Sequence, residues 1–315
     1  MSFTLDPDVA AAMSALAGDG PPPPAPVLGD WKSIRDAVAT TFAALGADVP
    51  EHPEVKQRTF TATAPDGTSI ALQWFALDGT DPGPAVVHAH GGGMVAGRLD
   101  LFAPYIAQYV AATQVPYLSV EYRLAPQMHG TGPAEDVYAG LAWLVEHAGE
   151  LGVDPQRIAI HGESAGAGIA AGVAILARER GIALARQILI YPMLDDRTIT
   201  PDPHLDPVAT WPYVSNRTGW EALLGEERGT ETVSPVAAPA RLTDFEGLAP
   251  AYIEIGEIDI FRDESLAYAR GLWHAGVSTE LHVHPGLVHG FDQFAPQAPA
   301  TRRAFADRVR VIASL

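Results

Sequence analysis

From about residue 57 onward, short apolar runs alternate with segments of helical periodicity. Several of the runs are continuously apolar, as expected for parallel strands covered on both faces of a sheet. The predicted strands are 58–64, 69–75, 84–90, 116–122, 157–162, 187–192, 251–256 and 279–285. The predicted helices between and after them are 101–113, 134–149, 165–180, 263–275 and 298–313. This alternation predicts an α/β fold with a mostly parallel, eight-stranded sheet flanked by helices.

The first fifty residues follow a different pattern, which predicts two helices. Apolar residues recur at helical spacing within 5–16, and the proline-rich stretch 18–26 then stops the helix. Asp30 is the predicted N-cap of a second helix that ends at Gly46.

Residues 193–248 also interrupt the alternation, because they are rich in proline and contain no clear strand. The interval is longer than an ordinary connection. With the N-terminal helices it is predicted to form a lid over the carboxyl edge of the sheet, where α/β proteins bind ligands.

Composition narrows the function classes. The chain has 315 residues, is 47% hydrophobic, carries a formal net charge of -18 and has no cysteine. Without a basic cluster we expect no nucleic-acid partner and no attraction to anionic membranes. The longest apolar stretch, near 168–177, is shorter than the roughly 20 residues of a membrane span. The N-terminus lacks the basic start of a signal peptide, so we expect a cytoplasmic protein.

The stretch GESAG, residues 162–166, brackets one serine with small residues between a predicted strand and a predicted helix. A sharp strand-to-helix turn of this kind lifts a serine hydroxyl clear of the sheet. A serine nucleophile needs a base and an orienting acid, which follow in the order acid, then histidine, in this arrangement. Asp259 and His289 are the candidates, since each lies just after a late strand.

A glycine-rich segment, His90 to Gly93, follows the third predicted strand. Acyl transfer requires backbone N–H donors for the oxyanion, from the residue after the nucleophile and from this loop. Because glycines let the backbone approach a ligand closely, the segment fits that role. His90 is predicted to anchor the loop by hydrogen bonding.

Five motifs together resemble the bacterial hormone-sensitive-lipase-like family of α/β-hydrolase esterases, over about residues 57–315. They are HGGGM at 90–94, YRLAP at 122–126, GESAG at 162–166, DIFRDE at 259–264 and GLVHGF at 286–291. The resemblance implies N-terminal cap helices in 1–50 and an α/β-hydrolase catalytic domain in 51–315, with an insertion at about 193–248 that completes a helical cap.

The resemblance further implies a serine carboxylesterase that hydrolyses short- to medium-chain acyl esters without a cofactor. Ser164 would be the nucleophile, His289 the general base and acid, and Asp259 the carboxylate that orients the imidazole. The implied oxyanion donors are Gly92, Gly93 and Ala165, and the supporting loop residues are His90 and Gly91. A homodimer through the edge of the last strand is also implied.

The sequence departs from the family pattern at three places. Ile260 follows Asp259 where the family has proline, and residues 127–136 differ from the usual continuation of YRLAP. Glu163 stands where aspartate or threonine is commoner, and we assign it no catalytic role. Pocket-lining residues are predicted from their chemistry: Met94, Trp211, Tyr213 and Trp220.

Three alternatives remain at this stage. Residues 166–171 also match a dinucleotide fingerprint, but Asp195, the nearest strand-end acid, lies beyond the about 20 residues that this motif requires. The second alternative is a non-catalytic small-molecule binding module on the same fold.

The third alternative is a metal site, suggested by the His-x-His pairs at 88–90 and 282–284. No carboxylate follows either pair at ligand spacing, so we expect no metal. The acidic pair Asp195 and Asp196 is predicted to be a solvated turn.

Overall fold

The computed structural model describes residues 3–17, 24–79 and 82–315. Its eight strands form one sheet in the order β1-β2-β4-β3-β5-β6-β7-β8. Their bounds are β1 Lys56–Thr63, β2 Ser69–Ala76, β3 Gly83–Ala89, β4 Tyr117–Val120, β5 Val153–Glu163, β6 Arg186–Ile190, β7 Ala251–Gly256 and β8 Thr279–His284. Only the pairs β1–β2 and β2–β4 are antiparallel among these strands. The predicted mostly parallel, eight-stranded sheet is confirmed.

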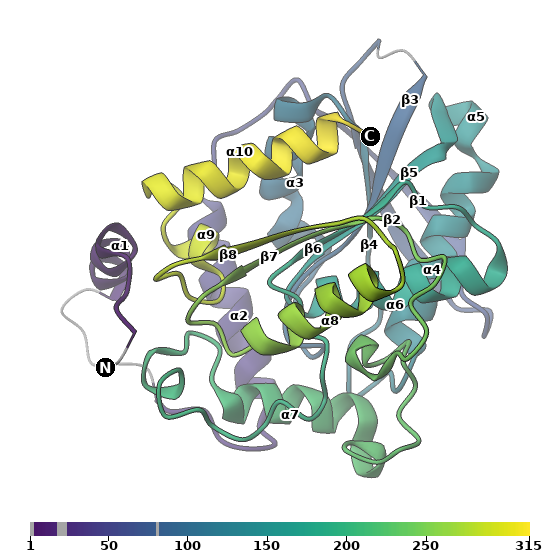
Figure 1. Cartoon of the computed structure of the whole chain (residues 1–315). Helices are drawn as coiled ribbons and strands as arrows, with labels where there is room; N and C mark the ends of the chain where they lie inside the picture. The colour runs from purple at the N-terminus through teal and green to yellow at the C-terminus, as the bar shows by residue number, and fades with distance from the viewer. Residues whose placement is uncertain (1–2, 18–23, 80–81) are drawn as a thin grey trace.

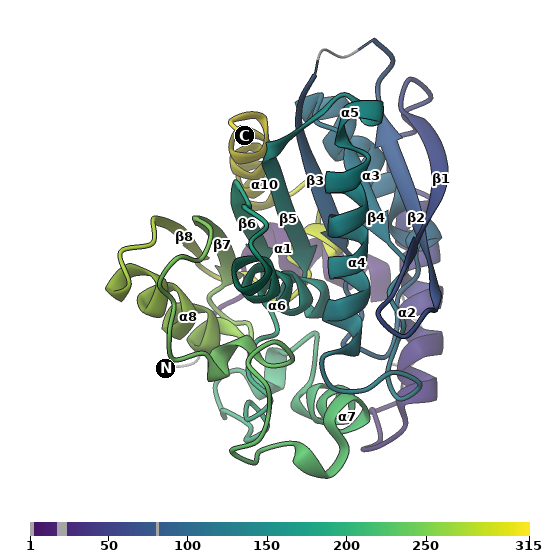
Figure 2. The ribbon, with the colours of Figure 1, turned by 90° about the vertical axis from the view of Figure 1, so that its right-hand side faces the viewer.

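Helices cover both faces of this sheet. Their bounds are α1 Pro7–Ala17, α2 Trp31–Gly46, α3 Leu99–Thr113, α4 Gly132–Glu146, α5 Ala148–Leu151, α6 Ala165–Arg180, α7 Tyr213–Leu224, α8 Arg262–His274, α9 Phe291–Phe294 and α10 Pro299–Ala313. Helices α3 and α10 lie on one face, and α4, α6 and α8 lie on the other (Figures 1 and 2). The core therefore forms two apolar layers, one on each side of the central strands.

The observed elements differ from the predicted ones in a few bounds. The single helix predicted over 134–149 is two helices, because the backbone leaves helical geometry at His147. Strand β5 begins earlier than predicted, since Val153 already pairs with Gly83 of β3. The family resemblance implied a helical cap in the interval 193–248, but periodicity did not locate helix α7 there. Its buried residues include polar ones on several sides, so the apolar periodicity that marks a surface helix is weak.

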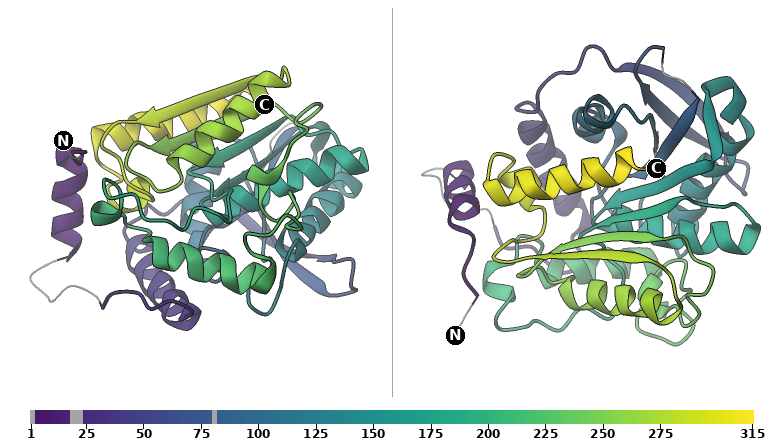
Figure 3. Two further views of the ribbon diagram at one scale, coloured as in Figure 1. Left: turned by 60° about the horizontal axis from the view of Figure 1, so that its bottom comes forward. Right: turned by 45° about the horizontal axis from the view of Figure 1, so that its top comes forward.

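The two N-terminal helices form as predicted. Asp30 caps α2 by accepting a hydrogen bond from the Ser33 N–H at 3.1 Å. Helix α1 lies at the side of the molecule against α9 (Figure 3), where Val9 is fully buried. Residues 18–23 of the predicted proline-rich helix stop lie outside the described residues.

Segment 193–248 meets the N-terminal region and the loop after β3. The Gly29 N–H donates to the Thr218 hydroxyl of α7 at 3.0 Å. Gly219, one residue further on, packs so closely on the Gly93 carbonyl that a Cβ there would lie 2.4 Å from its oxygen. Helix α7 consequently lies beyond the carboxyl ends of β3 and β5 (Figure 2).

The prediction of a solvated acidic turn after β6 is wrong for one of its two residues. Asp195 is partly exposed and pairs with Arg197, but Asp196 is fully buried. The Arg241 guanidinium donates to both oxygens of Asp196, at 2.8 and 2.9 Å. A buried carboxylate persists because this distant cation satisfies it, which the local sequence does not reveal.

Candidate active site

Ser164 lies at a strained turn between β5 and α6. Its backbone has φ 57° and ψ -123°, a conformation that non-glycine residues rarely adopt. The turn also requires a very close approach to β3, because a Cβ on Gly166 would lie 2.0 Å from the Ala89 carbonyl oxygen. The small residues of GESAG are therefore needed to fold this turn, as the sequence predicted.

Three side chains that are distant in the sequence form a chain of hydrogen bonds. The Ser164 Oγ lies 2.8 Å from His289 Nε2, and His289 Nδ1 lies 2.8 Å from Asp259 Oδ2. Asp259 is 1% exposed, and its other oxygen accepts the Phe261 N–H at 2.9 Å. This geometry assigns the His289 proton to Nδ1, so that Nε2 faces the serine hydroxyl as an acceptor.

The loop after β3 is held from several sides. The Tyr122 hydroxyl donates to the His90 carbonyl at 2.6 Å, and His90 Nδ1 bonds to the Gly91 carbonyl at 2.9 Å. Burial lowers the pKa of His90 to about 3, so its imidazole is neutral and Nδ1 carries the proton that it donates. His90 thus makes the kind of hydrogen bond that the sequence analysis expected of it.

The N–H groups of Gly92 and Gly93 have no hydrogen-bond partner among the residues that the structure describes. Both glycines have positive φ, 131° and 60°. Ala165, directly after the serine, is the first residue of α6, whose N-terminal end carries a partial positive charge. The candidate oxyanion donors on the glycine loop are therefore free to bind an oxyanion, and the N-terminal end of α6 adds the Ala165 N–H as a further donor.

Glu163 has a structural role that sequence reasoning missed. Its Oε1 accepts the Gly91 N–H at 3.1 Å, and its Oε2 lies 3.0 Å from His88 Nε2. His88 in turn bonds to the Ser119 hydroxyl at 2.6 Å through Nδ1. One carboxylate therefore joins the turn that carries Ser164 to the glycine loop. The only signal in the sequence was its place directly before the serine.

Among the four predicted pocket-lining residues, Trp211 contacts the glycine loop. A Cβ on Gly93 would lie 2.3 Å from the Trp211 ring, so the indole packs directly on this glycine. The adjoining Thr210 hydroxyl donates to the His289 carbonyl at 2.6 Å. Trp220 is fully buried, and Met94 and Tyr213 are at most 5% exposed, so their place in the pocket stays a prediction.

The glycines of the alternative dinucleotide fingerprint are occupied by protein contacts. A Cβ on Gly168 would lie 2.0 Å from the Met193 carbonyl oxygen, as one on Gly166 would clash with β3. Close packing of α6 therefore accounts for this motif, which agrees with the sequence analysis.

Two groups of side chains in the described structure have donor atoms close enough to share a metal ion. One is His88, His161 and Glu163, and the other is Glu280, His282 and Asp307. The sequence analysis saw no carboxylate at ligand spacing after either His-x-His pair. Folding supplies carboxylates from other positions to His88 and His282.

The sheet, the serine turn after β5 and the Ser-His-Asp chain of hydrogen bonds define an α/β hydrolase with a serine nucleophile site. Residues 86–293 match the family model described as alpha/beta hydrolase fold. The chain belongs to this family, within its hormone-sensitive-lipase-like esterases.

Named relatives support this family assignment. Carboxylesterase NlhH of Mycobacterium tuberculosis is 38% identical over 225 residues, 70% of each chain. Esterase LipI of the same species is 34% identical over 265 residues, 81% of each chain. A solved structure titled bacterial heroin esterase has a TM-score of 0.90 and 35% identity, and covers 99% of this chain and 98% of its own. The protein is a carboxylic-ester hydrolase.

No helix in the described part of the chain has the length and apolar character to cross a bilayer.

Proposed function

We propose that this protein hydrolyses short- to medium-chain acyl esters through an acyl-enzyme on Ser164. The observation that carries the proposal is the alignment of Ser164 Oγ, the His289 imidazole and the buried Asp259 carboxylate through two contacts of 2.8 Å. A hydroxyl, a base and an orienting acid in this order are what serine catalysis requires.

In the first half of the reaction, Ser164 Oγ attacks the ester carbonyl carbon while His289 Nε2 takes its proton. The negative charge on the carbonyl oxygen is stabilised by the N–H groups of Gly92, Gly93 and Ala165. His289 then protonates the leaving alcohol. Water repeats the sequence on the acyl-enzyme and releases the acid. Asp259 keeps the imidazole in the required tautomer and stabilises it when protonated.

The preference for short and medium acyl groups is supported by the position of segment 193–248. With residues 1–50 it is proposed to form a cap over the catalytic domain of residues 51–315. The Trp211 ring on Gly93 narrows the space above the oxyanion donors. The contact from Thr210 to the His289 carbonyl ties the same segment to the base. Substrate size is therefore set by the cap.

A homodimer through β8 and a cytoplasmic location complete the proposal. Strand β8 pairs with β7 and ends the sheet in the described structure, which leaves its outer edge unpaired. Val283 of β8 and Trp273 of α8 are 39% and 48% exposed. An unpaired edge with exposed apolar side chains favours strand pairing between copies. Light scattering on the protein and on Val283→Lys tests this, since the lysine should shift the mass toward the monomer. Cell fractionation tests the location.

The chemistry is tested with Ser164→Ala, a serine-reactive phosphonate probe and a chain-length series of p-nitrophenyl esters. We expect covalent labelling at Ser164 and loss of at least about 10⁴-fold in kcat in the alanine variant. Ser234→Ala, outside this site, is the matched control and should retain both labelling and turnover. Unlabelled Ser164, with no turnover of any ester, would support a binding module in place of an enzyme. A preference for long acyl chains would contradict the narrow pocket.

A further inference from the structure

A second polar cluster lies on the sheet and uses no atom of the Ser-His-Asp chain. His88 of β3 and His161 of β5 are directly opposite each other in the parallel register, and Glu163 follows two residues after His161. Because side chains two residues apart point to the same face of a strand, all three lie on one face of the sheet. The imidazole rings of the two histidines are 5.5 Å apart between their centres.

The donor atoms of this cluster are close enough to bind one ion. One nitrogen from each histidine and one oxygen from Glu163 all lie within 4.8 Å of one another. His88 Nε2 and Glu163 Oε2 are 3.0 Å apart. Ligands at about 2.0–2.1 Å from a tetrahedral zinc ion are separated by roughly 3.3 Å, so His88 and Glu163 are already at nearly this spacing, and the His161 nitrogen starts within 4.8 Å of both.

His161 is the unusual member of the cluster. It is 1% exposed, yet neither of its ring nitrogens has a hydrogen-bond partner among the described residues. Buried polar groups without a partner are rare and call for an explanation.

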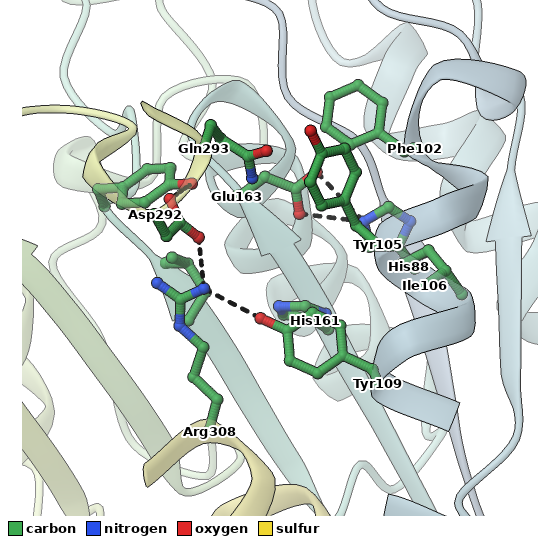
Figure 4. A pocket seen from close by; sticks show the side chains of 12 residues that line it. His88, Phe102, Tyr105, Ile106, Tyr109, His161, Glu163, Asp292, Gln293 and Arg308 are labelled. Carbon is green, nitrogen blue, oxygen red and sulfur yellow. Dashed lines mark hydrogen bonds and ion pairs between the residues drawn. The ribbon is translucent and has the colours of Figure 1, made fainter. Parts of the chain in front are cut away.

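A small cavity adjoins the three side chains. Its volume is about 20 Å³, and its wall includes His88, His161, Glu163, Tyr109 and Gln293. Figure 4 shows the two histidines and Glu163 arranged around it. This volume holds about one water molecule, and a three-ligand metal site needs space for one such fourth ligand.

We propose that His88, His161 and Glu163 form a buried Zn²⁺ site with a water molecule as the fourth ligand. Two imidazoles and one carboxylate match the preferences of Zn²⁺, whereas Mg²⁺ and Ca²⁺ prefer oxygen ligands alone. The surroundings also orient the ligands. Ser119 holds His88 through Nδ1, which leaves Nε2 for the ion, and the Gly91 N–H holds Glu163 through Oε1, which leaves Oε2.

Zn²⁺ at this site is a structural ion that joins β3 to β5 directly beneath the serine turn. Since it binds the folded state, it raises the melting temperature with increasing concentration. The inference does not rest on the proposed function, because none of its ligands is Ser164, His289 or Asp259.

The test uses the full chain after chelator treatment, with Zn²⁺ alone as the probe. We expect one tightly bound ion per chain by elemental analysis after dialysis, and a rise in melting temperature on titration. Both should be lost in His161→Asn. In Ser119→Ala, which keeps all three ligands, affinity should fall by about 10- to 100-fold. Circular dichroism establishes whether the variants are folded. If His161→Asn does not fold, the loss of affinity in Ser119→Ala still decides the test.

Two control variants separate this site from other histidines. His282→Asn removes the partly exposed group Glu280, His282 and Asp307, and His289→Asn removes the imidazole beside the serine; both should bind Zn²⁺ as tightly as the wild type. Retained binding in His161→Asn, or loss in either control, would place the ion elsewhere and overturn the proposal. Absence of any tight Zn²⁺ would show that the cavity holds water only, which overturns it too.

Discussion

Glu163 offers a sharp test of how the serine turn and the glycine loop are coupled. Its carboxylate accepts the Gly91 N–H at 3.1 Å and contacts His88 Nε2 at 3.0 Å. Glu163→Ala removes both interactions and leaves the Gly91 N–H without its partner. The neighbouring Gly92 and Gly93 are then free to shift. The predicted effect is a loss of oxyanion stabilisation without a change in the residues that form the triad.

The magnitude follows from these contacts. Hydrogen bonds to charged groups contribute about 1.5–3 kcal/mol each. Complete loss of one oxyanion donor lowers kcat by about 100- to 1,000-fold, which sets the upper limit. Since the loop is also held through His90 and Tyr122, we expect a partial displacement, with kcat reduced about 10- to 100-fold. KM should change little, because the interaction strengthens in the transition state.

The assay is steady-state hydrolysis of p-nitrophenyl butyrate in the presence of chelator, with urea unfolding in parallel. Glu163→Gln keeps an oxygen acceptor for Gly91 and should stay within about fivefold of the wild-type kcat. Glu150→Ala, on the exposed side of α5, controls for a general loss of a carboxylate. A kcat for Glu163→Ala within twofold of wild type would refute the coupling. Equal losses in the glutamine and alanine variants would show that charge, not the hydrogen bond, matters.

Three further predictions concern stability and specificity. Arg308→Met should destabilise the fold by about 3–5 kcal/mol in urea unfolding, because Arg308 is buried against Glu254 and Asp292. The control Arg310→Met, at the exposed end of α10, should lower the stability by less than about 1 kcal/mol. Equal losses in the two variants would contradict this account. Burial raises the pKa of Glu264 well above its usual value of 4.5. Its contribution to stability is thus fully present below pH 4.5 and is lost as pH rises through the raised pKa of the folded state. Glu264→Gln should therefore gain stability over wild type by up to about 1.4 kcal/mol per pH unit between pH 4.5 and that raised pKa. A constant difference across pH would refute this. Trp211→Ala should raise the ratio of kcat/KM for p-nitrophenyl octanoate over butyrate by about tenfold, and an unchanged ratio would exclude Trp211 from the pocket.

The local sequence was sufficient to predict most of the fold. Continuous apolar runs predicted the parallel strands, and the cap at Asp30 predicted the start of α2 within the residues described. Helix α7 was not located from the pattern because its buried face mixes polar and apolar residues. Its place is set by contacts with Gly93 and Gly29, which are distant in the sequence.

The candidate active site was also predictable, because its residues occupy recognisable positions in the sequence. The serine turn tolerates only small neighbours, so its geometry is recorded in the five residues 162–166. Asp259 and His289 were predicted from their order and from their positions just after strands. The chain fold brings them to Ser164 because parallel strands end at the same edge of the sheet.

Contacts between distant segments were decided only by the tertiary structure. Nothing local marks Asp196 as the buried partner of Arg241, or Glu163 as the acceptor of the Gly91 N–H. The register of β3 and β5 placed His161 opposite His88, and a shift of one residue would have turned them to opposite faces. The sequence by itself determined most of the elements and the serine turn, because those depend on neighbouring residues. Which charges and imidazoles meet in the interior depends on strand order and register, and these exist only in the folded chain.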